Sequence, residues 1–161
     1  MSSSEAGVPR GTRLPEEVKG VTLPSCEARM IEEIAQRYGL ELIILFGSRA
    51  KGNPHAESDC DVAVKAGESF PLEESERLRW ETALEEELAV VLAVPEGLDL
   101  VVLNEAPSLL AYEVARSGRP LYERDSLVFR RFQSSAYLRY FDDERLYLKR
   151  KAYLKERIHA R

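Results

Sequence analysis

A short apolar run that ends abruptly in Gly-Ser constrains this chain more than any other feature. The run is Leu42-Ile43-Ile44-Leu45-Phe46, and Gly47-Ser48 follows it directly. Its length and its isoleucine and leucine content favour a buried strand. Gly47 has no Cβ and therefore permits a sharp turn with an exposed backbone. Backbone N–H groups and the Ser48 hydroxyl in such a turn can point at an anion such as phosphate.

Ten residues after this turn, a second apolar run opens with Asp59-Cys60-Asp61. Because side chains alternate along a strand, Asp59 and Asp61 project from one face and Cys60 from the other. Adjacent carboxylates repel each other unless a cation lies between them. Oxygen ligands that leave open positions suit Mg²⁺ held together with substrate phosphates. The pattern predicts a phosphate-binding turn beside a metal-binding strand.

A third aspartate, Asp99, interrupts the apolar run from Leu98 to Leu103. Aspartate is disfavoured in strands, and an unpaired buried carboxylate is costly. One such residue can be a satisfied structural acid or a turn cap, but that explanation does not suit all three. Asp59, Asp61 and Asp99 are therefore the candidate catalytic and metal-binding residues.

The connector after the turn supplies weaker candidates. Arg49 and Lys51 are candidate phosphate partners, although either can equally be solvated. A Walker-type loop is excluded, because Asn53-Pro54 stands where that loop needs lysine and a hydroxyl residue. His55 is expected at the surface.

Strands alternate with helices along the chain, which predicts an α/β (α+β) fold with a mixed sheet flanked by helices. The expected strands cover residues 42–46, 59–65, 98–103 and 119–123. The expected helices run from a cap at Thr22 or Ser25 to Tyr38, and over residues 71–93 and 108–117, with a C-terminal helical tail capped by Asp125 or Ser126.

The length of 161 residues favours one domain. We expect a flexible leader over residues 1–20, the main domain over 21–124 and a helical extension over 125–161. No run approaches the length of a membrane span and the start lacks the apolar core of a signal peptide, so no membrane contact and a cytoplasmic location are expected. The two cysteines have no metal-site or disulfide pattern, and Cys60 is expected to be buried.

Charge is unevenly distributed along the chain. The net charge is −5, yet from Phe129 onward ten lysines and arginines stand against four acids. Basic residues interleaved with tyrosines can bind nucleic acid, dock on an acidic protein or form a plain solvated helix. The acidity of the rest of the chain argues against a broad DNA-binding face, so direct nucleic-acid binding is not expected. We expect residues 144–161 to contact a protein partner.

Gly47-Ser48, ten residues and then Asp59-x-Asp61, with Asp99 on a later strand, resembles the pattern of the DNA polymerase β-like nucleotidyltransferase superfamily. Within it, residues 31–122 resemble the minimal nucleotidyltransferases, which are usually paired with a HEPN-domain toxin. The resemblance implies ATP as substrate and two Mg²⁺ ions. Asp59 and Asp61 would bridge both ions, and Asp99 would complete the ion near the acceptor. Gly47 and Ser48 would hold the triphosphate.

Three functions follow from this resemblance. The first is an antitoxin that transfers AMP from ATP to a tyrosine of a cognate HEPN ribonuclease toxin. The second is an antitoxin that acts by binding alone, but the intact set of three aspartates argues against a decayed site. The third is transfer to a small-molecule hydroxyl, as in aminoglycoside nucleotidyltransferases, for which the chain shows no obvious second domain. The base preference, the number of AMP groups, the acceptor residue and the stoichiometry of the complex are left open.

Overall fold

The computed structural model describes residues 25–50, 60–94 and 97–159. A four-stranded mixed sheet with the order β3-β2-β1-β4 forms its centre. β1 is antiparallel to both β2 and β4, whereas β2 and β3 are parallel. The elements, in chain order, are α1 (Ser25–Arg37), β1 (Leu40–Phe46), α2 (Gly47–Ala50), β2 (Cys60–Ala66), α3 (Glu74–Val91), β3 (Leu98–Val102), α4 (Ser108–Ser117), β4 (Arg119–Glu123) and α5 (Val128–His159).

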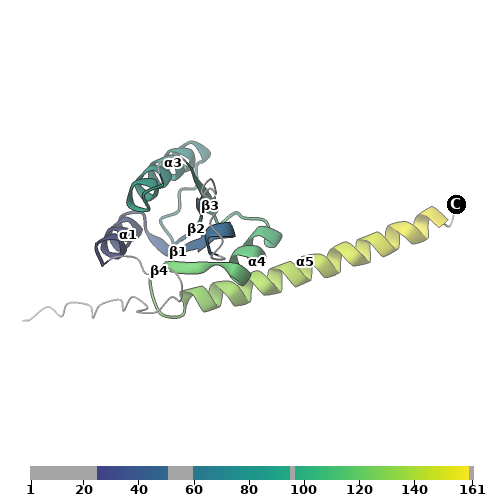
Figure 1. Cartoon of the computed structure of the whole chain (residues 1–161). Helices are drawn as coiled ribbons and strands as arrows, with labels where there is room; N and C mark the ends of the chain where they lie inside the picture. Colours follow the sequence, from purple (N-terminus) through teal and green to yellow (C-terminus); the bar gives the residue numbers. More distant parts are fainter. Residues whose placement is uncertain (1–24, 51–59, 95–96, 160–161) are drawn as a thin grey trace, which may run out of the picture.

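Helices cover both faces of the sheet, with α1 and α3 on one side and α4 and α5 on the other (Figure 1). β1 is buried on both faces because its apolar side chains alternate. Ile43 and Leu45 pack in the core under α1 and α3, whereas Leu42 and Ile44 pack in the core under α4 and α5. The apolar run therefore forms a central strand, and the α/β prediction is confirmed.

Several boundaries differ from those expected from sequence. β1 begins at Leu40, two residues earlier than predicted, and a short helix, α2, replaces the start of the predicted turn-rich connector. α3 is shorter than predicted because it begins at Glu74 rather than at Pro71. It ends before Ala93, whose φ of 51° is incompatible with a continuing right-handed helix.

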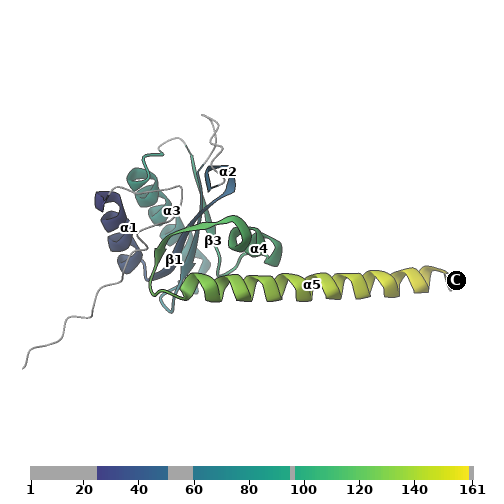
Figure 2. The ribbon, with the colours of Figure 1, turned by 60° about the horizontal axis from the view of Figure 1, so that its bottom comes forward.

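α5 is one helix of 32 residues, of which only the first part packs on the domain. Val128, Phe132 and Ala136, spaced four residues apart, are buried against α4 and the sheet. Every side chain described from Phe141 to Ala152 is exposed, and this half of the helix projects away from the sheet (Figure 2). Among the described helices, none has the length and apolar character needed to cross a bilayer.

Candidate active site

Gly47 joins the end of β1 to α2 in a backbone conformation that excludes most residues. Its φ is +71°, in the left-handed region where a Cβ is strained. A Cβ built on Gly47 would lie only 2.0 Å from Oδ2 of Asp61. The Asp61 carboxylate thus lies directly against the turn, and only glycine allows both the turn and this approach.

Strand register brings Asp99 beside Asp61. These two residues are partners in the parallel pairing of β2 with β3, while Asp61 is also the partner of Phe46 on β1. Adjacent strands lie about 4.8 Å apart. Asp61 of β2, Asp99 of β3 and Gly47, which directly follows β1, therefore form a row at one end of the sheet.

Both described carboxylates lie on the α4–α5 side of the sheet. The neighbouring residues Cys60 and Leu98 are buried in the core under α1 and α3, and alternation places Asp61 and Asp99 on the opposite face. Asp61 is half-buried and Asp99 is exposed, so this end of the sheet is open to solvent. The burial of Cys60 confirms the prediction that it packs as a small apolar residue.

The remaining predicted site residues are only partly described. Ser48 is half-buried in α2, directly after Gly47. Arg49 belongs to the same short helix, without a described side chain. Asp59, Lys51 and His55 lie outside the described residues. Their roles remain predictions.

The described side chains fit a hard divalent cation. Asp61 and Asp99 offer carboxylate oxygens only, which is the donor type that Mg²⁺ prefers. The Asp61 carboxylate can lie against the turn because Gly47 has no Cβ, which would come within 2.0 Å of Asp61 Oδ2. Among the described residues, no three His, Cys, Asp or Glu side chains are grouped so that they could hold a metal ion. The described part of the predicted triad consists of two carboxylates, Asp61 and Asp99.

Sequence reasoning missed the contact between Gly47 and Asp61, which lie 14 positions apart. The contact depends on the pairing of β1 with β2, and no local pattern specifies that register. The glutamates of α3 form no group that could hold a metal ion among the described residues. Most of these side chains are exposed, and Glu87 accepts hydrogen bonds from Arg37 of α1 and from Tyr38, the residue directly after α1.

The sheet, its turn and its row of carboxylates define the class of protein. Residues 29–127 match the family described as Polymerase beta, Nucleotidyltransferase, and the chain belongs to this family.

Two curated relatives carry the name protein adenylyltransferase MntA. The one from Aphanizomenon flos-aquae is 31% identical over 62% of this chain and 67% of its own length. The one from Shewanella oneidensis is 37% identical over 52% of this chain and 54% of its own length, so the match spans about half of that relative. A solved structure of a toxin–antitoxin with AMP-PNP contains a similar chain, with a TM-score of 0.59 and 26% identity. That similarity covers 81% of this chain and 98% of the other.

Proposed function

We propose that this nucleotidyltransferase is an Mg²⁺-dependent protein adenylyltransferase and an antitoxin. It would transfer AMP from ATP to a tyrosine hydroxyl of a cognate HEPN ribonuclease toxin and thereby neutralise the toxin. The row formed by Gly47 directly after β1, Asp61 of β2 and Asp99 of β3 is the observation that carries the proposal. The names of the curated relatives and the toxin–antitoxin structure with AMP-PNP agree with it.

In the proposed reaction the tyrosine oxygen forms a bond to the α-phosphorus of ATP, and the bond from that phosphorus to the pyrophosphate oxygen breaks. Bound Mg²⁺ would neutralise phosphate charge during this step. Asp61 and Asp99, together with Asp59, would hold two ions. Asp99, exposed at the edge strand of the site, would also accept the proton of the tyrosine hydroxyl.

The turn would position the nucleotide. The Ser48 hydroxyl and backbone N–H groups after Gly47 would donate hydrogen bonds to the triphosphate, with Arg49 and Lys51 as further candidate partners. Phosphoryl-type transfer asks the protein mainly for positioning and electrostatic stabilisation. A rigid turn held between the strand β1 and the Asp61 carboxylate meets this requirement.

The projecting half of α5 is the proposed partner surface. Its exposed large apolar side chains would be unusual on a helix that meets only solvent, and they stand beside several basic residues. They are Phe141, Leu146, Tyr147 and Leu148. The proposed parts of the chain are a leader (1–20), a nucleotidyltransferase domain (21–124) and an extension (125–161). The first turns of the extension pack on the domain. We place the reaction in the cytoplasm, where ATP is available.

A label-transfer assay tests this function. The protein is mixed with Mg²⁺, ATP labelled at the α-phosphate and its cognate HEPN toxin, and the label is followed on a denaturing gel. The proposal expects label on the toxin and none with the Asp61→Asn variant. Toxin inhibition without label would favour an antitoxin that acts by binding, and label on an added small-molecule hydroxyl alone would favour the aminoglycoside-type alternative.

A further inference from the structure

A concave site lies at the end of the sheet opposite the candidate active site. It is a cavity of about 650 Å³ between the ends of β2 and β4 and the first turns of α4 and α5. Glu41, near the start of β1, lines it, whereas Phe46 at the end of β1 adjoins Gly47. Five residues of strand span roughly 17 Å at about 3.3 Å per residue, so the two sites are separate.

Four cationic side chains converge on this cavity from three parts of the fold. They are Lys65 of β2, Arg124 after β4, and Arg131 and Arg139 of α5. Arg131, Ser135 and Arg139 follow each other at intervals of four residues, which places them along one face of the helix. Two acids, Glu41 and Asp125, also line the cavity. Two positive charges therefore remain in excess, in a chain whose net charge is −5.

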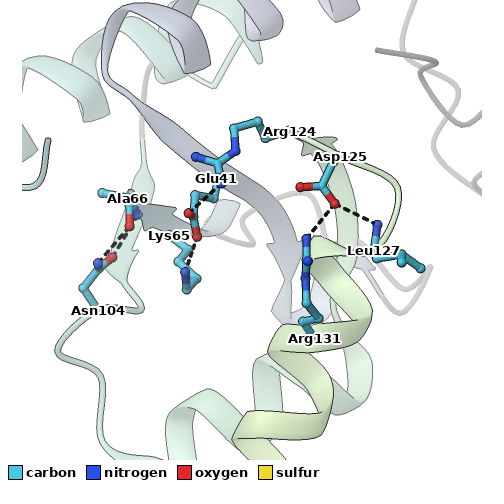
Figure 3. Close-up of polar contacts among 8 residues, drawn as sticks. All are labelled: Glu41, Lys65, Ala66, Asn104, Arg124, Asp125, Leu127 and Arg131. Carbon is cyan, nitrogen blue, oxygen red and sulfur yellow. Dashed lines mark hydrogen bonds and ion pairs between the residues drawn. The ribbon is translucent and has the colours of Figure 1, made fainter. Parts of the chain in front are cut away.

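The two acids hold the cations in place (Figure 3). Glu41 pairs with Lys65 through one oxygen and with Arg124 at 3.0 Å through the other. Asp125 accepts hydrogen bonds from Arg131 at 2.7 Å and from the Leu127 N–H at 3.3 Å. Each guanidinium still has N–H donors beyond these contacts. Arg139 has no ion-pair partner among the described side chains.

The side-chain amide of Asn104, which also lines the cavity, already has hydrogen-bond partners. Asn104 exchanges two hydrogen bonds of 2.9 Å with the backbone of Ala66, which uses its amide group. Leu103 and Phe132 contribute apolar surface beneath the charged rim. The rim is therefore the part that can recognise a ligand, and what it offers is guanidinium and ammonium groups.

We infer that this cavity, which we call the rim site, binds a small ligand that carries two or more phosphate groups. Guanidinium groups match phosphate oxygens in pairs and remain charged at all working pH values. The volume lies in the range of small-molecule sites. A concave site of this size suits a compact polyanion better than an extended peptide, which needs a groove or a sheet edge. Nucleotide phosphates and inorganic pyrophosphate share this chemistry. The inference does not rest on the proposed function.

Calorimetric titration with inorganic pyrophosphate tests the rim site. EDTA is present and the salt is low, so that metal-dependent binding at the aspartates does not contribute and screening is weak. Arg139→Gln breaks no described ion pair, and we expect it to raise the dissociation constant about tenfold, as for one lost charge-assisted hydrogen bond. Arg130→Gln is the matched control, because Arg130 is equally basic and exposed on α5 but does not line the cavity. The dissociation constant of the Arg130→Gln variant for pyrophosphate should stay within about twofold of the wild-type value.

Further arms of the titration separate the alternatives. ATP that binds with the same dependence on Arg139 identifies a nucleotide as an acceptable source of the phosphates. The inference is overturned if the wild type fails to bind pyrophosphate, or if Arg139→Gln and Arg130→Gln behave alike. It is also overturned if Ser48→Ala abolishes binding, which would place the anion at the Gly-Ser turn, or if an oligoglutamate peptide binds more tightly than pyrophosphate.

Discussion

Gly47 and Gly39 adopt similar left-handed conformations, with φ values of +71° and +64°, but only Gly47 adjoins the candidate active site. We expect alanine at either position to cost about 1–2 kcal/mol of folding stability. Gly47→Ala should also abolish AMP transfer, because its Cβ would displace the Asp61 carboxylate. Gly39→Ala, whose Cβ meets the Ser69 side chain, should keep the specific activity of the folded protein. Equal specific activity of the two variants would show that the Gly-Ser turn is not part of the active site.

Ser48 has a positioning role in the proposed site. Ser48→Ala should therefore weaken transfer by roughly 10–100-fold, the effect of one lost hydrogen bond to a charged group. The loss should be smaller than that caused by Gly47→Ala. The measurement is the initial rate of label transfer at saturating ATP. A rate equal to that of the wild type would show that the hydroxyl does not contact the triphosphate.

Asp61 and Asp99 can be tested without damage to the core, because one is half-buried and the other is exposed. Asp61→Asn and Asp99→Asn should abolish transfer and leave the protein folded. Mg²⁺ with ATP should raise the melting temperature of the wild type and raise that of these variants much less, since ligand binding stabilises only a competent site. Glu76→Gln, at an exposed position on α3, is the control. Near-normal transfer by Asp61→Asn would contradict the metal assignment.

Tyr38, directly after α1, connects α1 to α3. Its hydroxyl donates a 2.8 Å hydrogen bond to Glu87 of α3. Burial raises the pKa of Tyr38 above its ordinary value of 10.0, and the hydrogen bond to Glu87 adds to this shift. Burial also raises the pKa of Tyr122. Because both folded-state pKa values are raised, their contribution to stability is fully present below pH 10 and is lost as the pH rises through the folded values.

Denaturant unfolding at pH 8 and pH 11 measures this effect. Tyr38→Phe should lose less stability between the two pH values than the wild type does. Tyr147→Phe, at an exposed position on α5, should lose as much as the wild type. The assignment fails if the two variants show the same dependence on pH.

α5 divides into a packed and a projecting half, and truncation separates them. Removal of residues 144–161 should leave a folded protein that still binds Mg²⁺ and ATP, because no side chain described in that segment is buried. The same truncation should impair modification or binding of the toxin. Removal of residues 128–161 should destabilise the domain, because Val128, Phe132 and Ala136 leave the core. Full-rate modification by the shorter truncation would make the projecting half dispensable.

At the scale of the whole molecule, sequence periodicity predicted the class of fold and the bounds of α4 and β4, since local apolar patterns and glycine or proline stops specify them. The row formed by Gly47, Asp61 and Asp99 required the strand order and register, which are non-local. The rim site was not predicted for the same reason. Lys65, Arg124 and Arg139 are far apart in sequence, and each alone has the pattern of an ordinary solvated residue.

The central claim is that this chain transfers AMP to a HEPN toxin, and intact-mass spectrometry tests it most directly. The protein is incubated with Mg²⁺, its cognate HEPN toxin and each nucleoside triphosphate in turn, and the intact mass of both proteins is measured. With ATP, we expect the mass of the toxin to increase by that of one or more AMP groups. We expect no increase when Asp61→Asn replaces the wild type. AMP transfer would be contradicted if the toxin stayed unmodified with every nucleotide while the wild type bound both the toxin and Mg²⁺ with ATP.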